Sequence, residues 1–196
     1  MIREEILCIS VNLQKVLAVA VAVAVTASSV VATPSTKKAD AASYKAYLCL
    51  QTAKFTFRNQ HDDAKFSNKL QNTTNKLSKN SVKFKDTTMK KGKKTYTVQL
   101  TGLNKCIAKD KTFNTLYVDT NIKGKDKKKV TVTNVNVFFD GKKVKTIKKG
   151  VLTPDPGQTD GFVQLQIINM WNSRVAKFKY TMPKKTIKVT YTVKIK

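Results

Sequence analysis

The sequence predicts an all-β protein: an antiparallel β-sandwich of the jelly-roll kind, with about nine strands and a signal peptide in front. Two observations predict this fold. Apolar and polar residues alternate with a period of two in several short segments, and turn residues separate these segments at short intervals. No stretch of the chain shows convincing helical periodicity. Because 196 residues fit about one domain, we expect a single sandwich over residues 43–196.

The clearest strand lies at residues 187–195, where every odd position is apolar and every even position is polar. Such alternation places one face of the strand on a core and the other in water. Residues 96–101 and 82–85 alternate in the same way. Residues 113–118 and 162–170 carry large residues on both faces, which is typical of buried central strands. The segment 44–58 supplies one or two further strands.

A hairpin is predicted within residues 130–150. The apolar residues occupy even positions up to Val132 and odd positions from Val135 onward. This change of parity at Thr133-Asn134 predicts a β-bulge or a short break in the strand. Asp140-Gly141 then separates two strand-like runs, and a two-residue Asp-Gly turn is a strong hairpin signal.

Two stretches are expected to be loops. Residues 64–77 have loosely spaced apolar residues but many Asn and Thr residues, which disfavour helix. We therefore expect a long loop there, with at most one turn of helix. Residues 154–157 read Pro-Asp-Pro-Gly, which predicts a surface loop.

Residues 1–42 are interpreted as a signal peptide and a short linker. Val16–Val25 is an unbroken apolar run, too short to span a bilayer but suited to the apolar region of an export signal. Ala39–Ala41 fits a cleavage site, and Val30–Ala32 is a second candidate. The alternative is an uncleaved amphiphilic tail or membrane anchor. We expect a secreted or cell-surface protein with no transmembrane segment in the mature chain.

The chain is strongly basic, with 38 Lys and Arg residues, 12 Asp and Glu residues and a formal charge of +26. Only Arg3, Arg58 and Arg174 are arginines, the residue type suited to bidentate readout of phosphates and bases. We therefore expect attraction to anionic polymers but no specific nucleic-acid partner. The lysines that would carry a polyanion site lie in two turn-like clusters: Lys90, Lys91, Lys93, Lys94, Lys125, Lys127, Lys128 and Lys129. The alternative is a solvated lysine-rich surface.

Catalytic residues are scarce, so we do not expect an enzyme. Glutamate is absent after Glu5, and His61 is the only histidine. No serine motif accompanies His61, and no loop of spaced oxygen ligands surrounds Asp62 and Asp63. The sequence therefore predicts no metal and no cofactor, and we expect a monomer.

Cys49 and Cys106 are the two cysteines of the expected domain. Outside the cell they can form a disulfide, which would close a long loop and add ~3–4 kcal/mol. The alternative is two small buried apolar residues, because a free cysteine packs as one.

Trp171 is the only tryptophan, and Asn172 follows it. Aromatic rings stack on sugar faces, and amides can hydrogen-bond sugar hydroxyls, so this pair suits contact with a glycan. The alternative is a tryptophan packed in the core of the sandwich.

Four segments resemble a family of exported β-sandwich domains: Ala46–Thr52, Phe55–Asp62, Val132–Gly141 and Asn169–Asn172. Domains of this kind resemble carbohydrate-binding modules and occur in surface and secreted polysaccharide-degrading proteins of gut-type Gram-positive bacteria. The resemblance covers most of residues 44–196 in order. In that family the Phe-Arg-Asn segment tends to continue Ala-Trp, where this chain has Gln60-His61. Such domains are also commonly acidic, whereas this chain is basic.

The resemblance and the Trp-Asn pair together imply a non-catalytic protein that binds polysaccharide or cell-wall glycan. The residues expected at the carbohydrate site are Arg58, Asn59, His61, Trp171 and Asn172. The alternative function is an interaction protein held electrostatically to anionic wall polymers or other polyanions through the two lysine clusters. A steep dependence of binding on salt would distinguish the second function from the first.

Overall fold

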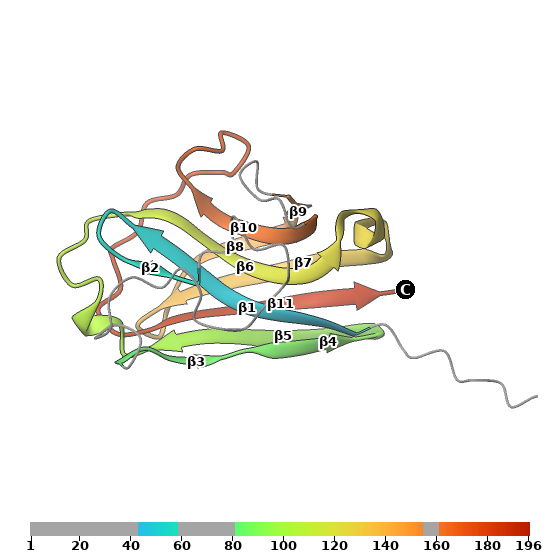
Figure 1. Cartoon of the computed structure of the whole chain (residues 1–196), viewed down its shortest axis with the longest axis horizontal. Helices are drawn as coiled ribbons and strands as arrows, with labels where there is room; N and C mark the ends of the chain where they lie inside the picture. Colours follow the sequence, from blue (N-terminus) through green and yellow to red (C-terminus); the bar gives the residue numbers. More distant parts are fainter. Residues whose placement is uncertain (1–42, 59–80, 155–160) are drawn as a thin grey trace, which may run out of the picture. The chain divides into compact units, whose positions relative to one another are not determined.

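The structure is a computed structural model that describes residues 43–58, 81–154 and 161–196 (Figure 1). The first of its two sheets contains β1 (Ser43–Thr52), β2 (Thr56–Phe57), β4 (Thr87–Lys90), β6 (Phe113–Lys123), β9 (Leu152–Thr153) and β10 (Phe162–Asn169). The second sheet contains β3 (Lys83–Lys85), β5 (Gly92–Thr101), β7 (Val130–Phe139), β8 (Lys142–Gly150) and β11 (Ile187–Ile195). Two short 3-10 helices, η1 (Leu103–Lys105) and η2 (Gly124–Lys129), connect strands.

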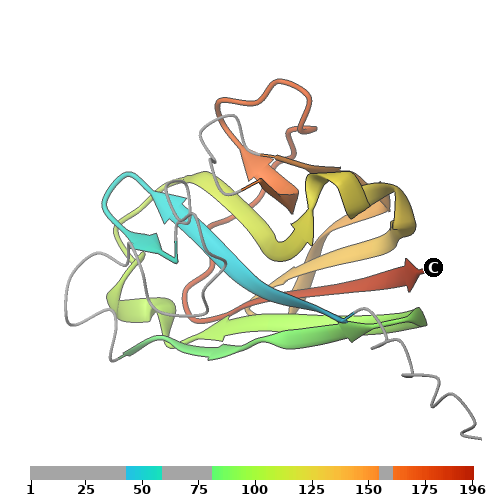
Figure 2. The ribbon, with the colours of Figure 1, turned by 45° about the vertical axis from the view of Figure 1, so that its right-hand side comes forward.

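Both sheets are antiparallel, and they form two layers (Figure 2). The first has the order β2-β1-β6-β10-β9, with β4 also paired to β1, and the second has the order β3-β5-β11-β7-β8. Their inner faces share one apolar core, to which Leu48 and Leu116 contribute from the first sheet and Val137 and Val189 from the second. The predicted all-β sandwich is confirmed, with eleven strands among the described residues. The excess over nine comes from short strands such as β2 and β9, each two residues long, which are too short for alternation to reveal.

The predicted hairpin and bulge are confirmed. Asp140 and Gly141 join β7 to β8, with φ values of 48° and 83°. Two positive φ values suit the twist of a tight hairpin. In the pairing of β7 with β11, Thr133 lies opposite Thr192 and Asn136 opposite Thr190. One residue of β11 therefore faces two of β7, and this bulge returns the valines on both sides of it to the core.

The Asp140 carboxylate fastens the segment before β11 to the β7–β8 turn. It accepts hydrogen bonds from the backbone N–H groups of Lys184 (2.6 Å), Lys185 (2.8 Å) and Thr186 (2.8 Å). Partial burial raises the pKa of this carboxyl, but the hydrogen bonds outweigh it and hold the pKa below its ordinary value. The carboxylate thus holds the C-terminal end of residues 170–186, which run from β10 to β11 and are named the strap below.

Cys49 and Cys106 are both free, so the disulfide considered from the sequence is not formed. Cys49 is buried between Tyr47 and Tyr117, in a cluster separate from the main core. Cys106 follows η1 and packs against the main core, with its sulfur 3.5 Å from the hydroxyl of Ser81. Burial raises the pKa of the Cys49 thiol well above its ordinary value. This cysteine is a neutral apolar residue, as the alternative interpretation held.

Several expectations concern residues outside the described ranges: the signal peptide and linker at 1–42, the loop at 64–77 and most of the loop at 154–157. Within the described ranges, no helix has the length and apolar character needed to cross a membrane.

Candidate ligand-binding site

Arg58 is a structural residue and not an exposed contact. Its side chain is 0% exposed, and its guanidinium forms two hydrogen bonds to the Asp86 carboxylate, at 2.7 and 3.1 Å. The guanidinium carbon also lies 3.8 Å from the centre of the Phe84 ring. Arg58 thereby ties the end of β2 to the link between β3 and β4. It offers no surface to a sugar, and we remove it from the candidate site.

Sequence reasoning missed this role because the partners of Arg58 are remote along the chain. Asp86 lies 28 residues away, and the chain pattern alone does not pair the two charges. The other residues proposed from the same segment, Asn59 and His61, lie outside the described residues.

Trp171 lies on the surface, so the alternative of a core tryptophan is wrong. Its side chain is 63% exposed, and that of the preceding Met170 is 56% exposed. Monomeric proteins expose single large apolar residues often, but two adjacent ones on a tight turn mark a candidate contact surface. The exposed pair lies at the end of β10, where the strap begins.

The turn that carries Trp171 is held by side-chain amides. Asn169 accepts a hydrogen bond from the backbone N–H of Trp171 (3.0 Å). Asn172 donates to the side-chain oxygen of Gln166 (2.8 Å) and accepts from the backbone N–H of Arg174 (3.0 Å). These bonds fix the backbone on both sides of Trp171 and so pre-organise the turn that presents the ring, which lowers the entropic cost of binding. Asn172 is half-buried and serves mainly to position the turn.

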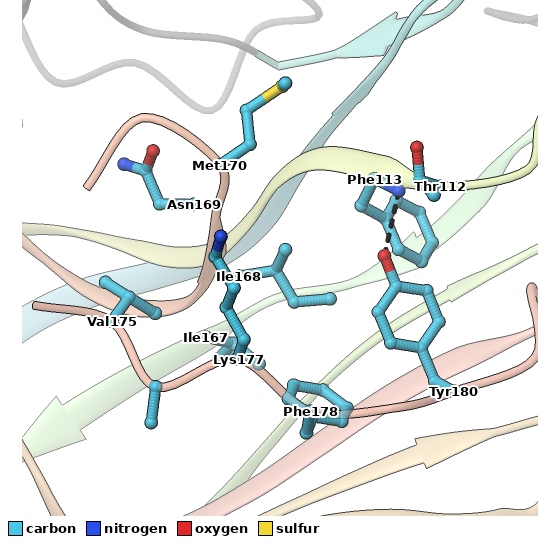
Figure 3. Close-up of a pocket in the computed structure, with 11 residues that line it drawn as sticks. Thr112, Phe113, Ile167, Ile168, Asn169, Met170, Val175, Lys177, Phe178 and Tyr180 are labelled. Atoms are coloured by element: carbon cyan, nitrogen blue, oxygen red, sulfur yellow. Dashed lines mark hydrogen bonds between the residues drawn. The ribbon is translucent and has the colours of Figure 1, made fainter. Parts of the chain in front are cut away.

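A cavity of about 290 Å³ lies next to this turn, between the start of β6, the end of β10 and the strap (Figure 3). Its wall is largely apolar, and the residues that define it are Phe113, Ile168, Met170, Val175, Phe178 and Tyr180. Figure 3 shows Val175 across the cavity from the rings of Phe113 and Tyr180. The Tyr180 hydroxyl accepts a hydrogen bond from the backbone N–H of Phe113 (3.0 Å). The strap side of the cavity is therefore bonded to β6.

The aromatic residues of the wall form one packed group. The ring of Tyr180 lies 5.3 Å from Phe178, 5.8 Å from Phe113 and 5.6 Å edge-on from Phe139, measured between centroids. The sequence signal that can locate this wall is the alternation Phe178, Tyr180, Met182 after the tryptophan. The strap forms no strand there, yet these three side chains pack against the core, and Lys179 and Thr181 between them are exposed.

Three polar groups along β6 and β10, the strands that lead to the turn, are buried without a hydrogen-bond partner. They are the Thr115 hydroxyl on β6 and, on β10, the side-chain oxygen of Gln164 and the side-chain nitrogen of Gln166. Buried polar groups in proteins are nearly always satisfied, and ordered water commonly does this. Gln166 also accepts the hydrogen bond from Asn172, so this polar row reaches the turn of Trp171.

The two lysine clusters predicted from the sequence lie together at the other end of the sandwich. Lys93 pairs with Lys194 of β11 across the β5–β11 ladder, and the backbone N–H of Lys196 donates to the carbonyl of Lys129 (3.0 Å). The β4–β5 turn, the end of β11 and η2 are therefore neighbours. We name the following exposed side chains the lysine end: Lys90, Lys91, Lys93, Lys94, Lys125, Lys127, Lys128, Lys129, Lys194 and Lys196.

Asp126 in η2 neutralises only a small part of the positive charge at the lysine end. Its carboxylate pairs with Lys129 at 2.8 Å, and this hydrogen bond lowers the pKa of Asp126 below its ordinary value. The pair is exposed, so water and salt screen it strongly. Strand β6 runs from one end of the sandwich to the other. Near its start, Thr115 lies opposite Asn169 beside the turn of Trp171, and after its last residue the chain enters η2 at the lysine end. At ~3.3 Å per residue, the turn of Trp171 and the lysine end are about 30 Å apart.

Among the described residues, no group of three or more acidic, histidine or cysteine side chains is placed to hold a metal ion. Comparisons of the chain with protein-family models, with curated proteins and with solved structures found no match.

Proposed function

We propose that this protein is a secreted or cell-surface, non-catalytic module that binds polysaccharide or cell-wall glycan at the turn of Trp171. The observation that carries the proposal is an exposed tryptophan on a pre-organised turn whose residues Asn169 and Met170 line an aromatic-walled cavity. A pyranose ring has one face of C–H groups, which stacks on an indole. A cavity of about 290 Å³ is close to the lower end of the range for small-ligand sites.

The roles of the residues follow from their positions. Trp171 is the stacking platform, while the apolar side chains of Met170 and Phe178 shape the adjoining wall. Asn169 and Asn172 hold the turn, and the half-buried Asn172 keeps an amide hydrogen for a sugar hydroxyl, because one donor of its NH₂ group remains. The resemblance to carbohydrate-binding β-sandwich domains supports the same ligand class.

The test uses Trp171 as its own probe. Because it is the only tryptophan, intrinsic tryptophan fluorescence reports from this site alone. Soluble plant and wall glycans are titrated into the purified protein, and binding is measured in parallel by affinity electrophoresis. We expect a ligand that changes the fluorescence and whose affinity falls about tenfold in Trp171→Ala, the equivalent of ~1.4 kcal/mol. The control, Val151→Ala, removes an equally exposed apolar side chain elsewhere and leaves the affinity unchanged. If no glycan binds, or if Trp171→Ala binds as well as the native chain, the proposal fails.

A second function is favoured by one specific observation, the gathering of ten lysines at the lysine end. We propose that this end attracts anionic wall polymers. Such binding falls steeply with salt, because each neutralised phosphate releases counterions. Lysine is a strongly hydrated point charge, so it provides attraction without reading a sequence or a sugar.

The matching test measures binding to a glycerol-phosphate polymer between roughly 50 and 300 mM salt. This range brackets physiological ionic strength, at which the Debye length is ~8 Å. The variant K90Q/K91Q/K93Q/K94Q should bind more weakly and with a shallower salt dependence. Trp171→Ala should bind this polymer as well as the native chain does. Salt-independent binding would contradict an electrostatic function.

A further inference from the structure

A second hollow, of about 720 Å³, adjoins the cavity beside Trp171. The two share Tyr180, which lines both. The second hollow lies between the β7–β8 turn and the strap, and it is basic. Four exposed lysines line it: Lys142 and Lys143 from the turn, and Lys179 and Lys184 from the strap. None of these four belongs to the clusters that the sequence singled out.

The charge of this hollow is largely uncompensated. Asp140 is the only acidic residue in its lining, and its carboxylate already accepts three backbone hydrogen bonds from the strap. None of the four lysines forms an ion pair with another residue of the described part of the chain. Several like charges held near one another raise the local concentration of an anion. The hollow is therefore a site for a negatively charged group.

Alternation along the strap places the apolar and the charged surfaces side by side. Phe178, Tyr180 and Met182 pack against the core, whereas the alternate residues Lys177, Lys179 and Thr181 are exposed. Lys145 of β8 adds a further charge, with its ammonium 5.3 Å from the centre of the Phe178 ring. Because Asp140 fastens the strap to the turn, the two walls of the hollow hold a fixed spacing.

We infer that the ligand is an acidic glycan, a polysaccharide whose sugars carry carboxylates. This inference rests on the proposed function and names its ligand class. One sugar stacks at Trp171 and the aromatic cavity, and the carboxylate of a neighbouring sugar lies in the lysine-lined hollow. The contiguity of the two hollows through Tyr180 favours a charged sugar over a polyol phosphate, which has no ring face to stack on an aromatic wall.

The experiment compares oligogalacturonate with the same oligomer after full methyl esterification, which removes the charge and keeps the sugar. Three forms of the full chain are titrated at physiological salt: native, K142Q/K143Q/K179Q/K184Q, and K90Q/K91Q/K93Q/K94Q. The last two lose the same charge, at opposite ends of the sandwich. The lysine end is about 30 Å from the turn of Trp171, which is well beyond the Debye length of ~8 Å at physiological salt. Binding is read by Trp171 fluorescence and by calorimetry.

We expect the native chain to bind the carboxylate form at least tenfold more tightly than the ester. The variant of the hollow should lose that preference while keeping its affinity for the ester, and the lysine-end variant should keep both. Equal affinity of the native chain for the two forms overturns the inference and leaves the proposed function standing. An equal loss in both variants also overturns it, because the attraction is then diffuse. Binding of neither form, with no response to neutral glycans, overturns the proposed function together with the inference.

A further arm uses the glycerol-phosphate polymer. If it competes with oligogalacturonate in the native chain and K142Q/K143Q/K179Q/K184Q abolishes its binding, the hollow takes any anion, and the assignment to a carboxylate-bearing sugar is wrong. Failure to compete supports the assignment. Thermal unfolding of both quadruple variants serves as a check that each retains the native fold.

Discussion

The two ends of the sandwich carry different kinds of surface. At the end of β10, a tryptophan, an aromatic wall and a basic hollow lie on a strap fastened by hydrogen bonds. At the lysine end, ten lysines project from two turns and a strand terminus, with no adjoining cavity among those described. The first surface has shape and fixed geometry, which provide selectivity. The second has charge alone, which provides attraction without selection. The same surplus of lysine therefore lies in two different structural settings at the two ends.

The largest expected effect is on the stability of the sandwich that carries both ends. Replacing Arg58 by alanine removes a fully buried side chain and leaves Asp86, whose side chain is 25% exposed, without its partner, which we expect to cost about 3 kcal/mol. Both ends should lose function together as the protein unfolds, and this is measured by denaturant titration. Arg174→Ala removes an exposed arginine and should change stability by less than about 0.5 kcal/mol. A small loss in R58A would mean that the buried pair is dispensable.

The strap, held by hydrogen bonds to Asp140, is present at the Trp171 end and not at the lysine end. Asp140→Ala removes the acceptor of three backbone hydrogen bonds and should cost about 1 kcal/mol, less than the ~1.5–3 kcal/mol typical of hydrogen bonds to charged groups, because the carboxylate is exposed. Glycan affinity should fall in this variant, while binding of the glycerol-phosphate polymer stays unchanged. Asp126→Ala is the matched control, an exposed carboxylate at the lysine end. Equal loss at both ends would show that the strap is not a local device.

The same carboxylate makes the Trp171 end sensitive to acid. The folded-state pKa of Asp140 lies below its ordinary value, so its contribution to stability is complete above the unfolded-state pKa, about 4. It is lost as the pH falls through the folded-state pKa. The stability difference between the native chain and Asp140→Asn should therefore be constant near neutral pH and shrink below about pH 4. Thermal unfolding across pH 2–7 measures it, and a difference independent of pH would refute the linkage.

The smallest effect is expected from the lysine end itself. K90Q/K91Q/K93Q/K94Q removes like charges from one turn, so stability should rise by no more than about 0.5 kcal/mol at low salt. The gain should vanish in high salt, where exposed charges are screened. A destabilisation that persists in high salt would mean that these lysines make structural contacts.

Much of the fold follows from local pattern. The alternation in residues 187–195 places Val189, Tyr191 and Val193 in the core, as found. The parity change at Thr133-Asn134 predicts the bulge, and Asp140-Gly141 predicts the hairpin turn. These features are predictable because strand periodicity and turn geometry depend on residues that are adjacent in the chain.

The candidate site was only partly predictable. The chemistry of Trp171 marks it as a candidate, but the sequence does not decide its exposure, since a lone tryptophan fits both core and surface. The wall at Phe178 and Tyr180 is not predicted, because an alternation of only three apolar residues is a weak signal. Arg58 was placed in the site on charge and segment resemblance, although Asp86 and Phe84 enclose it.

By itself, the sequence determined the fold class, the approximate positions of the long strands and a surplus of lysine. Only the tertiary structure decided where that surplus lies. Sheet pairing brings Lys93, Lys194 and Lys129 together from three segments, and the strap brings Lys179 and Lys184 opposite Lys142 and Lys143. The physical reason is range: alternation and turns are set by neighbours within a few residues, whereas a binding surface is set by which distant segments the core packs side by side.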